Sequence, residues 1–392
     1  MTRVGGERIP RGDRRPVRVT PGMARAFHGG MKTPRTSVSA RLAAILCALV
    51  IAPLVAAQRE RKPLVWDTTF VRDYSQRPTV RIYASHKFNS LLLRALPGYE
   101  DLRYRPNGRL NLGIGVSYRR LTLNIGLPAP FVNNDNDARG RTRFIDAQAN
   151  LYTVRQASNL FLQSYRGYHI TSHDQTQLGW EQPTLYPYRA DLRQFNIGFS
   201  SLRIHDHERF SYRAAFNQDA WQLRSAGSWL YGGYATCYVL KADSSIVPDR
   251  IRERFVASSA IHQGIIADIG PMASYAFTHV YEQHWFITVS GAGGAGLCMQ
   301  QLQVTATEGA KRVTDIGPGW HVQFRAAMGY NSARYYAGVV FNQELVGAFL
   351  RGQDRFAWDV GNFRIVIAQR IRQRSGTVDK GLRWLRSKDP TR

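Results

Sequence analysis

Apolar residues alternate with small or polar residues along most of the chain, most clearly from Arg109 to Leu127. The apolar positions are Leu110, Leu112, Ile114, Val116 and Tyr118, then Leu121, Leu123, Ile125 and Leu127. The intervening positions hold Asn, Gly, Ser and Thr, and the pair Arg119 and Arg120 separates the two runs. A period of two residues predicts strands, so we expect a β-hairpin with a tight turn.

The two faces of this hairpin distinguish two kinds of β-protein. A soluble sandwich buries its apolar face and exposes charge, whereas a transmembrane barrel turns the apolar face to lipid and keeps a small, polar face toward the lumen. The second description fits better, although a sandwich strand would also alternate. Leu112 and Ile114 are therefore expected to face lipid, and so are Phe324 and Ala326 of the later stretch 320–330.

The same period recurs in 79–95, 142–154, 159–170, 191–204, 210–240, 272–281, 284–303, 320–330, 335–343 and 362–371. We expect short turns near 119–120, 155–158, 205–209, 281–284 and 331–334. Long loops are expected near 96–108, 129–141, 171–190, 240–268, 304–318 and 346–360. Short turns on one side and long loops on the other are typical of outer-membrane barrels, which have an even strand number.

The sequence therefore predicts an all-β protein, a transmembrane antiparallel β-barrel of about twelve strands over 79–373. This count requires 210–240 to be one long strand, bent near 217–220. The tyrosines at strand ends, Tyr118, Tyr281, Tyr330 and Tyr335, are expected to form an interfacial girdle. Helix is expected only as a turn or two within 248–264 and at 380–384.

Residues 1–57 are expected to be an N-terminal extension and signal peptide. The apolar run 42–57 follows Lys32, Arg35 and Arg41 and ends in Val-Ala-Ala, which is the pattern of a cleaved secretory signal. Its 16 residues are short for a membrane-spanning helix, which needs roughly 20. We expect a periplasmic lead-in over 58–78 and a basic C-terminal tail over 374–392. A disordered arm is the alternative for the extreme N-terminus.

The chain is strongly basic, with 53 Lys and Arg against 28 Asp and Glu. Without the 10 basic and 2 acidic residues of 1–57, the counts are 43 and 26, a net charge of +17. The basic residues are scattered through strands and turns, and no nucleic-acid-binding motif accompanies them. We therefore expect no nucleic-acid partner. Outer-membrane lipid and lipopolysaccharide are the expected counterparts, and a small anionic solute is a candidate.

The sequence supports no cofactor and no metal. Cys237 and Cys298 are expected to be buried free thiols, with a disulfide as the alternative. The loop 133–140 resembles half of a calcium loop but lacks its glycine and terminal glutamate. The glycines at 291, 293, 294 and 296 lack the lysine of a phosphate-binding loop, so we interpret them as sites of bending or close packing.

Four segments resemble an uncharacterised family described as domain of unknown function 4421. They are Tyr104-Arg105-Pro106-Asn107, Tyr165-Arg166-Gly167-Tyr168, Arg189-Ala190-Asp191-Leu192 and, above all, RFSYRAAFNQDAWQLRSAGSW at 209–229. The resemblance covers roughly 67–372. It implies an exported, outer-membrane protein of Bacteroidetes type, and it implies no activity or catalytic residue. Unlike common barrels, this chain continues past 371 and does not end on an aromatic residue.

The segment 209–229 also carries the candidate functional residues, a lumen polar cluster of Arg213, Gln218, Gln222, Arg224, Ser225 and Ser228. Such a cluster binds a solute or satisfies its own hydrogen bonds. The function hypotheses are a narrow channel or binding pore for a small anionic solute, and a structural or adhesive envelope barrel with a plugged lumen. A phospholipase-type enzyme using Ser225 or Ser228 with His205, His207 or His279 is disfavoured, because no spacing motif marks a nucleophile.

The signal peptide and the lipid-type strand faces together predict an integral outer-membrane protein whose mature chain starts near Gln58. Membrane fractionation followed by N-terminal sequencing should recover that chain in the outer membrane after a carbonate wash. Recovery in the soluble periplasm would contradict the prediction.

Overall fold

The computed structural model describes residues 66–371 except 109, 119–120, 130–134, 174, 182–185, 307–308 and 351–353. The expected signal peptide and the basic tail lie outside these residues. The described residues all belong to one compact unit.

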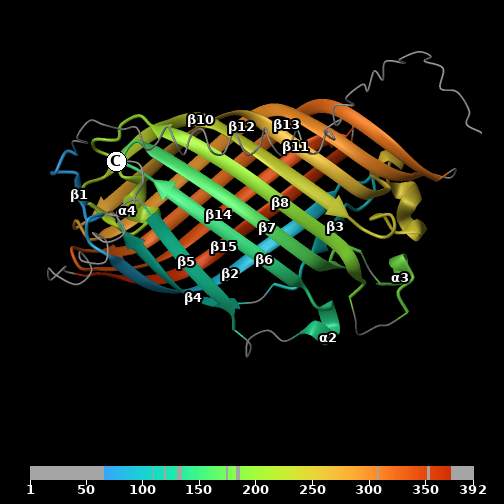
Figure 1. Cartoon of the computed structure of the whole chain (residues 1–392), viewed down its shortest axis with the longest axis horizontal. Coiled ribbons are helices and arrows are strands. Elements are labelled where there is room, and N and C mark those ends of the chain that lie inside the picture. The colour runs from blue at the N-terminus through green and yellow to red at the C-terminus, as the bar shows by residue number, and fades with distance from the viewer. Residues whose placement is uncertain are drawn as a thin grey trace, which may run out of the picture. The chain divides into compact units, whose positions relative to one another are not determined.

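The described residues form one large antiparallel sheet that curves into a barrel of tilted strands (Figure 1). Its strands are β2 (Thr79–Leu93), β3 (Leu102–Arg105), β4 (Leu110–Tyr118), β5 (Leu121–Pro128), β6 (Arg143–Tyr152), β7 (Gln156–Ile170), β8 (Tyr188–Ile204), β10 (Ala226–Lys241), β11 (Ile261–Tyr281), β12 (Trp285–Ala306), β13 (Gly309–Asn331), β14 (Tyr335–Leu350) and β15 (Asp354–Arg370). Short turns lie at one end, here called the turn end, and the longer loops lie at the other, the loop end.

Hydrogen-bonded pairing closes the sheet into a ring. β15 pairs with β2, β2 pairs with the short strand β3, and β3 pairs with β7. The ring then runs through β8 and β10 to β15, which makes ten strands. The hairpin β4–β5 extends from β2, and β6 extends from β7. The predicted all-β closed barrel is thus confirmed, and the pairings close it through ten strands with three more attached.

The two faces of the wall are inverted relative to a soluble protein. Outward-facing side chains are apolar and exposed, for example Ile114 at 61% and Phe324 at 41%. Inward-facing side chains such as Asn111, Ser117 and Gln323 are polar and buried. Leu112 is exposed and Ala326 half-buried on the outer face, as predicted. This arrangement suits a wall with lipid outside and a packed polar interior.

Aromatic side chains gather on the outer face at the turn end. Tyr281 and Tyr335 are exposed there, and Trp285 makes an edge contact with Tyr330 at a centroid distance of 5.4 Å. Trp229 contacts the ring of Tyr275 in a tilted arrangement, at a centroid distance of 5.0 Å. The predicted girdle positions therefore lie beside the short turns, where an aromatic belt belongs.

Two of the predicted long loops are wrong. β12 and β13 run 22 and 23 residues, and they continue past the expected strand ends to 306 and 309. β14 and β15 likewise extend to 350 and 354. The added part of β13 carries polar residues such as Lys311 and Arg312, so hydrophobic alternation gave no signal for it.

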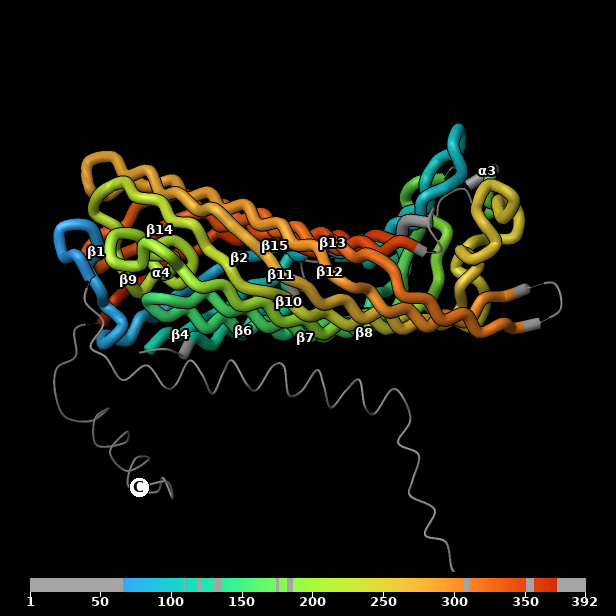
Figure 2. Tube along the Cα trace, turned by 90° about the horizontal axis from the view of Figure 1, so that it is seen from above, coloured from blue at the N-terminus to red at the C-terminus, as the bar shows by residue number. Residues whose placement is uncertain are grey.

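The prediction of one long strand over 210–240 is also wrong. The chain does turn at 205–209, as expected, but this turn does not join two wall strands. The chain leaves β8 at Ile204 and forms a folded insert before β10 begins at Ala226. The insert contains α4 (Tyr212–Phe216) and β9 (Ala220–Gln222), and it lies at the turn end (Figures 1 and 2). Gln218 at its bend has a φ of 60°, a left-handed conformation that interrupts strand pairing.

Segments outside the wall are short. The lead-in forms β1 (Val71–Asp73), which pairs with β9. Helices α2 (Asn136–Arg139) and α3 (Gln175–Leu178) lie at the loop end, and the predicted turns of helix in 248–264 are the 3₁₀ segments η1 (Asp249–Arg254) and η2 (Ala257–Ser259). Within the described ranges, no helix has the length and apolar character needed to cross a membrane.

Three smaller expectations concern β10 and β12. Cys237 and Cys298 are both buried and both free, as expected. A Cβ atom on Gly296 would lie 2.1 Å from the carbonyl oxygen of Ile269, which shows the close packing expected of this glycine run. Gly291, in contrast, has open space beside it on the outer face.

The outer face gives a prediction for a charge placed in the apolar band. Replacing Phe324 by Arg should lower the free energy of unfolding by about 2–4 kcal/mol, because the charge would lie near the middle of the band. Thr314→Arg, on the same strand beyond the band, should cost about 0–1 kcal/mol. Urea unfolding in phospholipid vesicles measures both, and equal costs would contradict the assignment.

Candidate functional site

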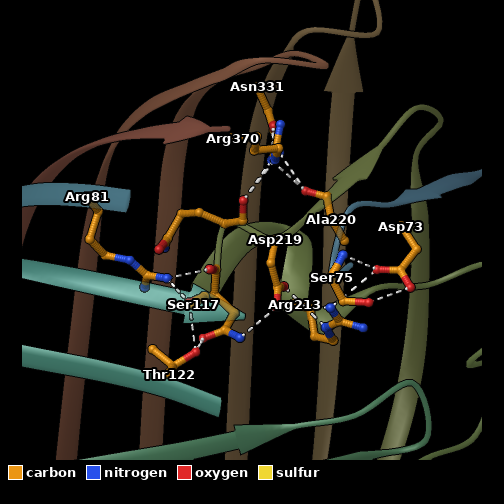
Figure 3. A network of polar contacts seen from close by, with 12 residues as sticks. Asp73, Ser75, Arg81, Ser117, Thr122, Arg213, Asp219, Ala220, Asn331 and Arg370 are labelled. Carbon is orange, nitrogen blue, oxygen red and sulfur yellow. Dashed lines mark hydrogen bonds and ion pairs between the residues drawn. The ribbon is translucent and has the colours of Figure 1, made fainter. Parts of the chain in front are cut away.

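The insert 205–225 occupies the turn end of the barrel. Every residue from Phe210 to Leu223 is buried, although only α4 and β9 have regular structure. Phe210, Tyr212 and Phe216 pack in one cluster with wall residues that include Tyr152 and Tyr336. A polar network surrounds this cluster (Figure 3). The insert is therefore a plug, and we use that name for it below.

Arg213 is the centre of the charge network within the plug. Its guanidinium pairs with Asp219 at 2.9 Å and with Asp73 at 3.3 Å, and its Nε donates to Asp219 Oδ1 at 3.1 Å. Burial opposes the charged form, but the two carboxylates outweigh it, so the pKa of Arg213 is raised above its ordinary value. Asn217 completes the group by donating to Asp219 Oδ2 at 3.1 Å.

Two wall arginines bind the backbone of the plug. Arg370 on β15 donates to the carbonyl oxygens of Gln218 at 2.8 Å and Ala220 at 3.0 Å, and to Asn331 Oδ1 at 2.8 Å (Figure 3). Arg81 on β2 donates to the carbonyl oxygen of Asn217 at 3.1 Å. A chain that leaves the sheet inside a barrel needs such partners, because its buried carbonyl groups have no ladder to join.

Further wall contacts fix the plug from other sides. Tyr336 donates its hydroxyl to the carbonyl oxygen of Ala215 at 3.0 Å. Thr122 donates to Asn217 Oδ1 at 2.9 Å, and Trp221 donates its indole N–H to the carbonyl oxygen of Gln283 at 2.7 Å. The plug therefore contacts wall strands on several sides of the barrel (Figure 3).

The N-terminal lead-in covers the plug. Trp66 and Phe70 pack against a cluster of Val71, Ala214 and Ala220. Tyr74 lies in a second cluster with Trp221 and Leu223. Trp66, Phe70 and Tyr74 thus hold the lead-in to the plug.

The predicted polar cluster divides into two groups. Arg213, Gln218 and Gln222 are buried in the plug, where Gln222 donates to the carbonyl oxygen of Arg209 at 2.7 Å and accepts from the N–H of Ser211 at 2.9 Å. Ser228 is buried on β10 and accepts from the N–H of Asp206. Arg224 and Ser225 are exposed and outside the lumen, because the chain turns outward before β10.

Of the serine and histidine candidates for catalysis, Ser225, His205 and His279 lie on the surface, whereas Ser228 is buried. Ser225 Oγ is 3.4 Å from His279 Nδ1, and it also accepts from the N–H of Val280 at 2.9 Å. None of the hydrogen bonds in the described part of the chain joins His279 to a carboxylate that would orient it. His207 Nε2 instead accepts from Arg155 Nε at 3.1 Å.

The calcium-like loop does not gather ligands in the part that the structure describes. Asp135 pairs with Arg139 at 2.9 Å along α2, and residues 133–134 lie outside the described ranges. Across the described residues, no group of three or more His, Cys, Asp or Glu side chains could hold a metal ion.

A second closure lies at the loop end. The segment 242–260, here called the cap, buries Ile246, Val247, Ile251 and Phe255 in a cluster with wall residues that include Tyr104 and Trp358. Tyr104 donates its hydroxyl to the carbonyl oxygen of Ile246 at 2.6 Å. Arg189 pairs with Asp191 at 2.7 Å and donates to the carbonyl oxygen of Ser245 at 2.8 Å.

Between the plug and the cap, Arg325 links side chains from several wall strands. Arg325 donates to Tyr152 at 2.6 Å and to Asn159 at 2.9 Å, and it lies 3.5 Å from Glu344. Beside this group remains a cavity of about 70 Å³ that Gln218 and Arg364 also line. That volume holds a few water molecules and no larger solute.

Sequence reasoning missed the wall residues that hold the plug. Arg81, Asn331, Tyr336 and Arg370 lie on strands remote in sequence from 209–229, so no local pattern connects them to it. Several residues of the resemblance motifs do have partners in the closures: Tyr104 and Arg189 contact the cap, and 209–229 contains most of the plug. These family motifs were therefore the signal in the sequence that could have pointed to residues of the two closures.

Comparisons with known proteins agree with the resemblance seen in the sequence. The family model described as Domain of unknown function (DUF4421) matches residues 65–348, which include the plug, the cap and most of the wall. Among curated proteins, none matches the chain.

Solved structures with some similarity are outer-membrane barrels. The outer membrane protease OmpT of Escherichia coli is 8% identical, with 76% of this chain and 97% of that one covered and a TM-score of 0.36. The translocator domain of the autotransporter NalP from Neisseria meningitidis is 9% identical over 85% and 99%, with a TM-score of 0.27. The Pseudomonas putida toluene transporter TodX is 6% identical over 75% and 89%, with a TM-score of 0.25. Likeness this distant assigns no activity.

The ion pair of the plug yields a prediction. Asp219→Asn should destabilise the folded plug by about 3–5 kcal/mol, because Arg213 would stay buried with Asp73 as its remaining carboxylate. Trypsin should then cut after Arg213, which is buried in the folded plug, in the detergent-solubilised protein. Asp249→Asn, which breaks an exposed pair with Arg252, should change stability by about 0–1 kcal/mol and leave Arg213 protected. Equal resistance in both variants would contradict the role of Asp219.

Proposed function

We propose, from the premise that this chain belongs to the DUF4421 family, that it is an outer-membrane β-barrel with a lumen closed by its own side chains. Its role would be that of a structural or adhesive envelope protein and not that of an open diffusion channel. The observation that carries this proposal is the plug, which is buried from Phe210 to Leu223 and hydrogen-bonded to the wall through Arg81, Tyr336 and Arg370.

The outer face of the wall supports the membrane placement. Exposed apolar residues such as Ile114, Ile287 and Ile365 occur on strands around the barrel, and water would not favour so much exposed apolar surface on a monomeric protein. We count twelve crossing strands in this placement: the ring without β3, together with β4, β5 and β6. Lipid and lipopolysaccharide are the proposed contacts of this face, and we propose export by the signal peptide.

The channel hypothesis remains a second candidate because the lumen is basic. Arg81, Arg213, Arg325 and Arg370 are all buried inside the barrel. If the plug moved, these cations would favour a small anion. Of the two arginines in the predicted polar cluster, Arg224 is exposed outside the lumen, which leaves Arg213. We propose no catalytic role, since the Ser225–His279 contact is exposed and has no orienting acid among the described residues.

Planar-bilayer recording tests the closed lumen. The native protein should show no steady conductance, because the plug and the cap close opposite ends. Replacing 207–223 or 243–259 alone by a short Gly/Ser turn should leave it silent, and replacing both should allow small ions through. Steady anion-selective steps from the native protein would overturn this proposal and favour the channel.

A further inference from the structure

The barrel wall contains a cleft where two neighbouring strands do not pair. β5 pairs with β4 and β6 pairs with β7, but no ladder joins β5 to β6 in the described residues. A cavity of about 560 Å³ lies at this place, lined from β2, β4, β5, β6 and β15. It is much larger than the cavity beside Arg325, which is about 70 Å³.

The cleft is basic. Lys87, Arg141, Arg143 and Arg364 line it, and Asp146 is its one acidic residue in the described part of the chain. Lys87 Nζ on β2 lies 3.1 Å from Asp146 Oδ2 on β6, so the Asp146 carboxylate already has a cationic partner. The other three cations leave an excess of positive charge that favours an anion.

Three buried polar atoms around the cleft have no hydrogen-bond partner. They are Arg364 Nε, a donor, and Asn124 Oδ1 and Asp146 Oδ1, which are acceptors. Buried polar groups are ordinarily satisfied, so their convergence on one cavity indicates a polar occupant. That occupant must accept from a guanidinium and must also donate, as a phosphate with neighbouring hydroxyl groups does.

The mouth of the cleft is apolar and faces outward. Leu127 on β5 is 70% exposed and Ile145 on β6 is 67% exposed, and both line the cavity. An apolar hollow of about 670 Å³ adjoins it on the outer face of β2, β4, β5 and β15. The two cavities share Tyr83 and Leu127, so a polar site continues into a surface suited to an acyl chain.

We propose that the β5–β6 cleft binds an anionic glycerophospholipid from the membrane, with its phosphate at Arg364 and its acyl chain on the outer hollow. The free hydroxyls of a glycerol head group would donate to Asn124 and Asp146. The unpaired edges of β5 and β6 give a physical reason for the site, because unsatisfied backbone groups are costly beside lipid and a hydrated head group supplies partners. The inference rests on the membrane placement proposed above and does not depend on the closed lumen.

Native mass spectrometry of the detergent-solubilised full chain with added phosphatidylglycerol tests the site. Two variants disrupt it by different means. Arg364→Gln removes the proposed phosphate contact, and Gly126→Leu fills the cavity, since a Cβ atom at Gly126 meets only the Tyr83 ring, with its hydroxyl at 3.0 Å. Each should weaken phosphatidylglycerol binding about tenfold or more, the loss that corresponds to about 1.4 kcal/mol.

Matched controls should bind as the native protein does. Gly291→Leu adds the same side chain on the outer face, where open space surrounds the glycine, and Arg203→Gln removes an exposed arginine near the turn end. A difference in SDS-gel mobility between heated and unheated samples checks that every variant is folded. Unchanged phosphatidylglycerol binding in folded Gly126→Leu would overturn the proposal.

The source of the ligand needs one further comparison. Soluble glycerol 3-phosphate at the same concentration should displace little phosphatidylglycerol, because it lacks the acyl chain that the hollow accommodates. Full displacement would mean that the site takes a soluble phosphate compound and would overturn the lipid assignment. Phosphatidylcholine binding as tight as phosphatidylglycerol binding would overturn the assignment of an anionic head group. None of these results depends on whether the barrel conducts ions.

Discussion

Backbone polar groups inside a bilayer must find hydrogen-bond partners within the protein, and the described structure can be understood from that requirement. It explains why β2 and β7 are joined through the short strand β3, which closes a ring that the β4–β5 hairpin leaves open. It also explains the inverted wall, with apolar residues outside and polar residues within. The β5–β6 cleft is the one exception among the described strands, and there the cavity, the unpartnered polar atoms and the basic residues coincide.

The same requirement governs the plug. Once the chain leaves β8, its carbonyl groups enter an interior with no free ladder, and the wall supplies arginine, tyrosine and asparagine donors for them. Arginine suits this role because its planar fork reaches several carbonyl oxygens at once, as Arg370 does with Gln218 and Ala220. The buried positive charge is thus explained by the insert it holds, and it does not by itself indicate a conducting path.

Local sequence pattern predicted the wall well and the interior poorly. Alternation found the strands and the outward faces of Ile114 and Phe324, because lipid exposure acts on every second residue. The alternation failed at 210–240, because residues buried on all sides do not alternate between apolar and polar. It also failed at 306–315, because strand pairing continues there without an alternating apolar face. It grouped Arg213, Gln218 and Gln222, which the plug buries, but it could not find Arg81 or Arg370. Arg81 and Arg370 come close to the plug only because the barrel closes around it.

Amide hydrogen exchange on the protein in lipid nanodiscs tests the central claim most directly, because a plug bonded to the wall must open before its amides exchange. The account predicts that backbone amides of 212–222 exchange as slowly as those of β12 and β13. Exchange of 212–222 within seconds, at the rate of exposed loop residues, would contradict it.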